Sequence, residues 1–380
     1  MQKIYLDNAA ATPLSKEVLS VMHESLQNNI GNPSSIHSFG RSVRAKIEMA
    51  RKNIANAIKA QSSEIIFTSG GTEANNMVFN CAVKDLQIKR IITCKTEHSA
   101  VLNPVFKLPQ GIEFEYVDIS DCGIINLAHL EKLLSQSEKK TLVSIMHINN
   151  ETGLISPISV INEICKRNKA LFHSDTVQSI AYFDFNLKEI DIDFVTCSGH
   201  KFHGPKGTGF LYTHPSNNIK SQIVGGGQER GLRSGTENLH GIVGLAAAIK
   251  LAYTHLDAHS KHVRAIKKHM VEGLRARVKG VEFNGDSDLE NRLYTVLNVK
   301  FPPHPNGGMS LFLLDLEGVA CSGGSACSSG ATKGSHVLES LGYHDPERAS
   351  LRFSFSCYNT FEEIDFALEA VSRVFYTVTE

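Results

Sequence analysis

The chain of 380 residues lacks an excess of charge of either sign, because 39 lysines and arginines balance 39 aspartates and glutamates. No overall field therefore draws it to nucleic acid or to an anionic membrane. It also lacks a long apolar run: the longest candidate span, residues 241–249, is far shorter than the roughly 20 residues that cross a bilayer. Residues 1–7 contain no apolar signal segment. We expect a cytoplasmic protein whose partners are small molecules or proteins, with no nucleic-acid binding and no membrane association.

Paired cysteines are absent as well. The eight cysteines form no Cys-x-x-Cys pair and no zinc-like doublets, so the sequence predicts no metal site and mostly reduced core thiols. Cys321 and Cys327 differ, because the run 318–330 around them is rich in Ser, Gly and Ala and favours neither helix nor strand. A thiol on such a loop is reactive where its surroundings lower its pKa, and a mobile loop would carry it between a buried site and an outside acceptor. Taken alone, the run reads as a plain surface loop.

The chain contains a regular alternation of short apolar runs with stretches that are long enough to form helices. Apolar residues stand at helical spacing in 15–28 and 40–60. Beyond them, stretches long enough for helices separate short β-branched runs at 65–67, 91–93, 142–145, 170–172 and 194–196. This alternation predicts an α/β fold with a largely parallel sheet, in which ligands gather at the carboxyl ends of the strands.

The length allows two domains in one subunit. A helical stretch from about 239 to 275 would link the sheet domain to a C-terminal part, which contains the segments 293–301, 310–316, 350–356 and a final amphipathic helix at 361–376. We place the boundary near residue 255. The expected division is an N-terminal segment 1–14 that associates with the small domain, a large domain 15–255, and a small domain 256–380 that carries the Cys327 loop.

Residues 198–207, Ser-Gly-His-Lys-Phe-His-Gly-Pro-Lys-Gly, are the most informative part of the sequence. A strand-like run ends at Ser198, and His200 and Lys201 follow it. A lysine binds an aldehyde cofactor covalently only as the neutral amine, so it needs a partly desolvated pocket at the end of a rigid element. Lys201 meets this requirement, and Ser198 and His200 would donate to a phosphate. For the lysine alone a solvated surface turn is an equal alternative, but the whole pattern favours the pocket.

A glycine turn after the strand-like run 65–67 opens a helix at Gly71 and Thr72. The free N–H groups of a helix N-terminus and a threonine hydroxyl form an anion site. The segment 68–75 has neither the Walker lysine spacing nor the Gly-x-Gly-x-x-Gly pattern, so it does not indicate a nucleotide. By itself the turn is better explained as a capped helix.

Polar residues also follow three other strand-like runs. Asp175, buried beside a pyridinium nitrogen, would keep that nitrogen protonated and the ring an electron sink. His98 would stack on the ring or move protons, and Asn150 would bind the cofactor or a substrate carboxylate. Each of these residues alone fits equally well as a hydrogen-bonded core residue. The glycine-rich segment 225–238 contains arginines and resembles a binding loop.

Together these segments resemble the cysteine desulfurases over nearly the full length, and within them the group that serves iron–sulfur cluster assembly and nitrogen fixation. These are pyridoxal-phosphate enzymes of the class V aminotransferase fold. The motifs that carry the resemblance are Asp-Asn-Ala-Ala-Ala-Thr-Pro at 7–13, Ser-Gly-Gly-Thr-Glu at 69–73, Thr-Glu-His at 96–98, Asn-Asn-Glu at 149–151, Asp-Thr-Val-Gln at 175–178, Ser-Gly-His-Lys at 198–201, Arg-Ser-Gly-Thr at 233–236 and Ser-Ala-Cys at 325–327. The resemblance implies an aspartate-aminotransferase-like (type I) fold, with a mostly parallel sheet in the large domain and a smaller α+β C-terminal domain.

The resemblance also implies how the ring of pyridoxal 5'-phosphate is held. Lys201 would bind its aldehyde as a Schiff base, and Asp175 would face the pyridine nitrogen. Gln178 would meet the phenolic oxygen, and His98 would stack on the ring. Asn150 would contact the cofactor or the substrate nearby.

The phosphate and the substrate carboxylate have implied partners too. Gly71, Thr72, Ser198 and His200 would hold the phosphate, with Thr236 supplied by the neighbouring subunit of a homodimer. Arg352 would clamp the carboxylate of L-cysteine, a task suited to its two-pronged guanidinium.

By the same resemblance, Lys201, His98 and Cys327 are the catalytic residues. L-cysteine would displace Lys201, whose freed amine would remove the α-proton. The Cys327 thiolate would attack the substrate sulfur, release alanine and keep a persulfide for acceptor proteins such as an iron–sulfur scaffold. Cys321 departs from the family pattern: an inert core thiol is preferred, and a second sulfur relay or a disulfide partner stay open. The rival functions are selenocysteine lyase, another lyase or aminotransferase of this fold, and a non-enzymatic scaffold.

Overall fold

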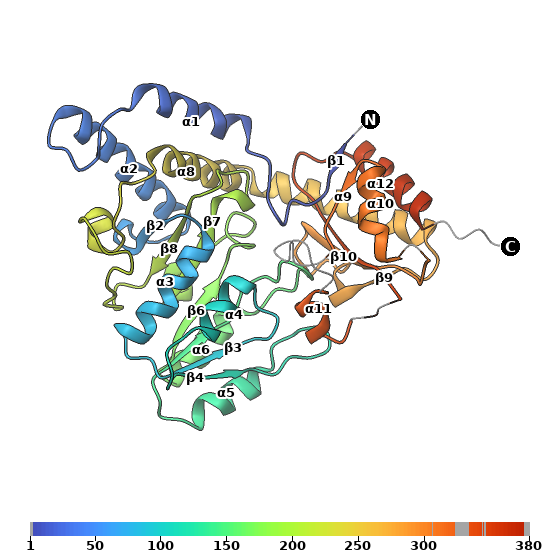
Figure 1. Ribbon diagram of the computed structural model, residues 1–380, viewed down its shortest axis with the longest axis horizontal. Helices are drawn as coiled ribbons and strands as arrows, with labels where there is room; N and C mark the ends of the chain where they lie inside the picture. The colour runs from blue at the N-terminus through green and yellow to red at the C-terminus, as the bar shows by residue number, and fades with distance from the viewer. Residues whose placement is uncertain (1–2, 306, 324–333, 344, 346, 376–380) are drawn as a thin grey trace.

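The computed structural model describes residues 3–305, 307–323, 334–343, 345 and 347–375. Figure 1 shows two groups of elements, one around a large sheet and one that contains most of the C-terminal third of the chain. A long helix pair runs from one group into the other.

The first group is built on a seven-stranded sheet of order β2-β8-β7-β6-β5-β3-β4. The strands are β2 (Ile65–Thr68), β3 (Arg90–Thr93), β4 (Glu113–Tyr116), β5 (Thr141–Ser144), β6 (Leu171–Asp175), β7 (Phe194–Ser198) and β8 (Gly209–Thr213). All are parallel except β8, which is antiparallel to both β2 and β7. The expected α/β fold with a mostly parallel sheet is confirmed.

Helices cover both faces of this sheet. They are α1 (Lys16–Asn28), α2 (Ser38–Ala57), α3 (Gly71–Lys84), α4 (Ser99–Phe106), α5 (Leu127–Ser135), α6 (Ile158–Arg167), α7 (Leu187–Ile190) and α8 (Leu239–Thr254). Successive strand residues point to opposite faces: Val195 packs in the core with α2, α6 and α8, while Phe194 packs in the core with α3 and α4. The sheet is therefore buried on both sides, which explains its continuous apolar runs.

The helical stretch expected at 239–275 is two helices, α8 and α9 (Leu256–Arg277), that meet at a bend of 75°. The helix breaks at His255, where the backbone leaves the helical region (φ −113°, ψ 14°). Residues of α8 pack under the large sheet, whereas residues of α9 pack in a separate apolar core. Within the described ranges no single helix is long and apolar enough to cross a membrane. Helices α8 and α9 reach that length and apolar content only when the bent pair is taken as one segment.

The second group has its own core around α9 and α12 (Phe361–Val374). Its antiparallel sheet has the order β12-β10-β9, with β9 (Glu282–Phe283), β10 (Val296–Lys300) and β12 (Ser350–Ser354), and α10 (Ser310–Leu316) and α11 (His336–Ser340) lie near it. The N-terminal strand β1 (Ile4–Tyr5) pairs with β11 (Val319–Ala320), and Asp7 bridges to Ser354. The first residues of the chain thus join the C-terminal elements, while the division at 14 and 255 stays a prediction.

Candidate active site

Lys201 lies where the sequence predicts it, at the carboxyl end of a central strand. Strand β7 ends at Ser198, and a 3-10 turn, Gly199–Lys201, follows. The turn needs glycine at 199, because a Cβ there would lie 2.9 Å from the side chain of Leu245. The Lys201 Nζ donates to the carbonyl oxygens of Ala9 at 2.7 Å and Ala10 at 3.0 Å. The N-terminal segment therefore crosses directly over the lysine.

Lys201 borders a cavity of about 220 Å³. The residues around it come from the carboxyl ends of five strands, β2, β3, β5, β6 and β7, and from the N-terminal segment. They are Ala10, Gly71, Thr72, His98, Ala100, Met146, Ile148, Asn150, Asp175, Val177, Gln178, Ser198, His200 and Lys201. Of the twelve candidate residues named from the sequence, the structure gathers nine here, while Thr236 and Arg352 are not in the lining and Cys327 lies outside the described residues.

Asp175 is the one carboxylate among the described residues that line the cavity. It ends β6 and is 8% exposed. Its Oδ1 accepts a hydrogen bond from the Val177 N–H at 3.0 Å, and its Oδ2 accepts one from the Asn75 side-chain amide at 2.8 Å. These two donors come from different elements, the turn after β6 and helix α3. The carboxylate is thus fixed in place and equipped to face a cationic ring nitrogen.

The N-terminus of α3 forms the anion-binding end of the cavity. Gly70 has φ +151° and Gly71 has no room for a side chain, since a Cβ at 71 would lie 2.7 Å from Val177 Cγ2. The Ser198 Oγ lies 3.0 Å from His200 Nδ1. Burial, with the nearby lysines, lowers the pKa of His200 to about 4. Backbone N–H groups, a hydroxyl and a neutral imidazole suit a phosphate.

His98 and Gln178 lie on the remaining sides. His98 caps α4, and its Nδ1 accepts the Ala100 N–H at 3.0 Å, which places the ring proton of the neutral form on Nε2. Burial lowers its pKa, although Asp175 opposes this shift. Gln178 Nε2 donates to the Ala9 carbonyl at 2.9 Å, so it also holds the N-terminal segment over the cavity.

Arg352 lies on β12, behind the cavity. It is 1% exposed, its Nη2 forms an ion pair with Asp7 Oδ1 at 2.9 Å, and its Nη1 donates to the Asn150 carbonyl at 3.0 Å. Its buried Nε has no hydrogen-bond partner among the described residues. The arginine is therefore joined to the cavity through Asn150, and its Nε–H is left without an acceptor among the described residues.

Thr236 is exposed and does not line the cavity of its own chain. The loop that carries it is nevertheless held firmly. Arg233 Nε pairs with Glu73 Oε1 at 2.9 Å, and the buried Glu229 forms two 2.7 Å hydrogen bonds with Arg51. The binding loop expected from its glycines is thus a tethered surface segment beside the N-terminus of α3.

The sequence is similar to known proteins whose family agrees with this site. The family described as Aminotransferase class-V matches residues 4–366. The cysteine desulfurase IscS of Dictyoglomus turgidum is 41% identical over 377 residues, which cover 98% of this chain and 94% of that protein. The chain belongs to the class V aminotransferases, among the cysteine desulfurases. The putative cysteine desulfurase IscS 1 of Bacillus subtilis is also 41% identical, over 389 residues and the full length of both chains.

Solved structures of this family share the fold. A NifS-like protein has a TM-score of 0.90 and 35% identity, covering 98% of this chain and 99% of that one. A NifS-like protein from Rickettsia africae has a TM-score of 0.89 and 31% identity, covering 99% and 100%. These relatives confirm the family recognised from the sequence, its fold class and the expectation of an enzyme.

The Ser-Ala-Cys motif at 325–327, including Cys327, falls in 324–333, outside the described residues. Its two flanks are well placed. On the N-terminal side Ser322 forms an antiparallel bridge with Arg352. On the C-terminal side Ser335 donates to the Glu151 carboxylate, and His336 Nε2 lies 2.8 Å from the Glu97 carbonyl. Both flanks are thus attached to neighbours of cavity residues.

Cys321 lies three residues before this undescribed range and is a free thiol. Burial, reinforced by Asp7, raises its pKa to about 12. A thiol that keeps its proton at neutral pH is a poor nucleophile. This favours the inert core thiol among the three roles considered for Cys321.

Sequence reasoning assigned no role to three groups that shape the site. Asn75 fixes Asp175, the backbone carbonyls of Ala9 and Ala10 receive the lysine, and the Tyr182 hydroxyl donates to the Lys201 carbonyl. Only Asn75 had a usable signal, since it lies one helical turn after Gly71 and so faces the same side as the helix start.

The residues present fit the cofactor of this family. A pyridine ring with an aldehyde and a phosphate requires an amine, a carboxylate opposite the ring nitrogen and an anion site at one end. The cavity supplies Lys201, Asp175 and the start of α3, where the glycine at 71 leaves space that any side chain would fill. The class V aminotransferases depend on pyridoxal phosphate in general, and the donor set here matches that dependence.

Proposed function

We propose that the chain is a pyridoxal-phosphate-dependent cysteine desulfurase, which converts L-cysteine to L-alanine and transfers the sulfur to Cys327 as a persulfide. The observation that carries the proposal is a convergence. Lys201, Asp175 and His98 share one cavity, and the segment with Cys327 is attached at both flanks beside it.

Each part of the cavity has a binding task. Asp175 would face the ring nitrogen, Gln178 the phenolic oxygen and His98 the ring. Gly71, Thr72, Ser198 and His200 would hold the phosphate. Bound in this way, the cofactor supplies an electron sink for the pair released when bonds at the substrate carbons break.

Arg352 binds the substrate carboxylate. A guanidinium presents two parallel donors, which suits a carboxylate, and burial strengthens such a charge-assisted pair. Asp7 holds the same guanidinium at 2.9 Å, so Asp7 either keeps it oriented or yields it to the substrate. Asn150 lies between this arginine and the cavity and contacts the substrate or the cofactor.

Lys201 moves the α-proton of the substrate. Its amine stands at the end of a rigid strand, and the carbonyl oxygens of Ala9 and Ala10 accept from it, so these oxygens would orient the amine once the substrate has freed it from the cofactor. Burial lowers the pKa of His98 and favours its neutral ring, which can accept a proton from the substrate in the cavity or return one to it.

The sulfur step belongs to Cys327. Its thiolate attacks the sulfur of L-cysteine, so an S–S bond forms while the C–S bond breaks and its electron pair stays on carbon. Protonation of that carbon gives alanine. The net change turns L-cysteine and one thiol into L-alanine and one persulfide, without an external oxidant.

The proposal extends to partners. A homodimer would bring Thr236 of one subunit to the phosphate of the other, which agrees with its exposed position in the single chain. Sulfur acceptors, such as an iron–sulfur scaffold protein or enzymes that thiolate tRNA and cofactors, would take the persulfide sulfur in the cytoplasm.

Alanine release from L-cysteine tests the lysine chemistry. The Lys201→Ala protein, loaded with cofactor, should release alanine at least about 100-fold more slowly, since general acid–base catalysis contributes roughly that factor or more. A Lys206→Ala protein is the matched control, because Lys206 is exposed, lies on the same turn and does not line the cavity. Alanine release by Lys201→Ala at the normal rate would contradict the proposal.

A further inference from the structure

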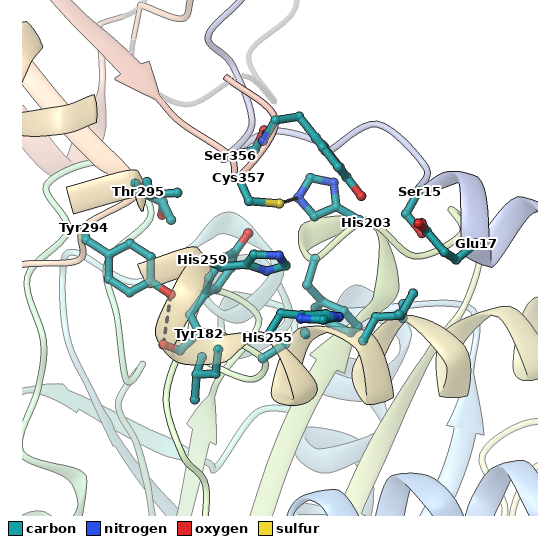
Figure 2. A pocket seen from close by; sticks show the side chains of 18 residues that line it. Ser15, Glu17, Tyr182, His203, His255, His259, Tyr294, Thr295, Ser356 and Cys357 are labelled. Atoms are coloured by element: carbon teal, nitrogen blue, oxygen red, sulfur yellow. Dashed lines mark hydrogen bonds between the residues drawn. The ribbon is translucent and has the colours of Figure 1, made fainter. Parts of the chain in front are cut away.

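A second cavity of about 230 Å³ lies on the other side of the Lys201 turn. It is as large as the cofactor cavity, and Figure 2 shows the side chains that enclose it. Its walls combine α8, the start of α9, the strand end around Tyr294 and the segment after β12. The cavity therefore lies between the two groups of elements, where binding sites are common.

Most of the wall is apolar. The apolar lining residues are Ala181, Phe202, Ala248, Leu251, Ala252, Leu256 and Val263. Aromatic rings of Tyr294 and Tyr358 add to it, and Glu17 is the one carboxylate among the lining residues and is exposed. A charged ligand would lose its hydration here without gaining a buried counter-charge, so an uncharged, largely apolar ligand is favoured.

Polar groups interrupt this apolar wall at three histidines, His203, His255 and His259, and at the hydroxyls of Ser15, Thr295 and Ser356. Among the histidines, His203 has a ring whose acceptor nitrogen is fixed by a backbone contact. His203 Nδ1 lies 2.9 Å from the Pro13 carbonyl, which can only accept, so the ring proton is on Nδ1 and Nε2 carries a lone pair. Burial lowers the pKa of His203, and its ring therefore stays neutral. This Nε2 lies 3.8 Å from the Cys357 sulfur, a contact marked in Figure 2. A thiol is a weak donor, which a ligand N–H or O–H would replace at little cost.

A metal ion does not fit the same groups. Within the described parts of the chain no three His, Cys, Asp or Glu side chains are arranged to hold one. Burial also raises the pKa of Cys357 to about 11, whereas metal binding needs the thiolate. The chemistry of the cavity thus points to an organic molecule.

The second cavity shares a wall with the cofactor site. Phe202 and His203 line it and directly follow Lys201 in the chain. Tyr182 also lines it, and its hydroxyl donates to the Lys201 carbonyl. Tyr294 in turn donates to the Tyr182 carbonyl at 3.1 Å, as Figure 2 shows. A molecule that moves Tyr182 or Phe202 would therefore shift the backbone that holds Lys201.

We propose that this second cavity binds a small, uncharged aromatic molecule with one hydrogen-bond donor, and that binding there shifts the backbone that positions Lys201. The aromatic walls provide ring contacts, and His203 Nε2 accepts the single donor. The site regulates the enzyme only if the molecule prefers one arrangement of the Lys201 turn over another.

Indole and 1-methylindole are a matched pair of probes, because they share size and rings but only indole has an N–H. Calorimetric titration of the cofactor-loaded protein should show indole binding with a Kd on the order of millimolar or tighter, as for a small fragment. 1-Methylindole should bind about 10-fold more weakly, the loss expected for one hydrogen bond. Equal affinities of the two probes, or no binding of indole, would overturn the proposal.

Two variants locate the binding. Ala252→Phe should fill the cavity and abolish indole binding, whereas Thr254→Phe, two residues further along α8 and exposed, should leave it unchanged. Equal binding by both variants would place indole elsewhere and refute the site. If Ala252→Phe does not fold, the comparison of the two probes still decides. Indole at saturation should also shift the absorption band of the bound cofactor, and an unchanged band would refute the link to Lys201.

Discussion

Replacement of Asn75 by leucine isolates the support of Asp175 from the rest of the site. Asn75 is fully buried on α3 and donates to Asp175 Oδ2 at 2.8 Å. Leucine has nearly the same shape and removes only the polar atoms. The Asp175 carboxylate then keeps a single donor, the Val177 N–H.

The size of the effect follows from that one bond. A hydrogen bond to a charged group contributes roughly 1.5–3 kcal/mol, which corresponds to about 10- to 150-fold in rate or in cofactor affinity. Folding stability should change much less. Asn75 Oδ1 is buried without a hydrogen-bond partner among the described residues, and leucine removes this unfavourable atom together with the favourable one. The expected net change in unfolding free energy is within about 1 kcal/mol.

Three measurements separate these effects: the rate of alanine release, the cofactor dissociation constant, and the pH dependence of the absorption of the bound cofactor. The absorption should titrate at a different pH in Asn75→Leu, because a less well stabilised carboxylate holds the ring proton less firmly. Asn80→Leu, on the same helix but away from the cofactor cavity, should behave as wild type. Wild-type activity and an unchanged titration in Asn75→Leu would refute the positioning role of Asn75.

Three further predictions follow from the geometry. Gly71→Ala places a Cβ 2.7 Å from Val177 Cγ2, and overpacking of about 1–3 kcal/mol should weaken cofactor binding roughly 5- to 150-fold in a cofactor titration. Gly227→Ala, which has open space around position 227, should bind the cofactor normally in the same titration. Glu229→Gln removes the charge opposite the buried Arg51 and should lower the unfolding free energy, measured with denaturant, by about 3 kcal/mol. The same change at the exposed Glu48 should lower it by less than about 1 kcal/mol. Equal losses in the two variants would contradict the importance of the buried ion pair. Burial lowers the pKa of His147 and His173 to about 4, below the value of about 6.5 in the unfolded chain, so the unfolded state binds more protons between these values. Stability should therefore fall as the pH drops from 6.5 towards 4, by up to about 1.4 kcal/mol per pH unit for each imidazole, and a flat denaturation profile in that window would refute the burial argument.

The sequence predicts the local half of this site well. Lys201, Asp175 and His98 all follow strands whose apolar runs are readable, and parallel strands end at one edge of their sheet. The antiparallel placement of β8 and the break at His255 were not predicted, because both depend on packing against distant parts of the chain. The same holds for the contact between Arg352 and Asp7, which joins residues 345 positions apart.

The pairing of Asn75 with Asp175 shows where such prediction ends. The two residues are 100 positions apart and meet only because α3 packs against strands β6 and β7. No periodicity in either segment encodes that crossing. The lysine motif, by contrast, needs only a strand end and a tight turn, and both are formed by consecutive residues of the segment 194–201.

Peptide mass spectrometry tests the central claim most directly. The purified, cofactor-loaded protein is incubated with L-cysteine without reductant, and the peptide that contains Cys321 and Cys327 is measured, with Cys327→Ser as the control. The account predicts a gain of one sulfur atom on Cys327 and none on Cys321, together with alanine in solution. Alanine released by wild type with no added sulfur on Cys327, or sulfur transfer that persists in Cys327→Ser, would contradict it.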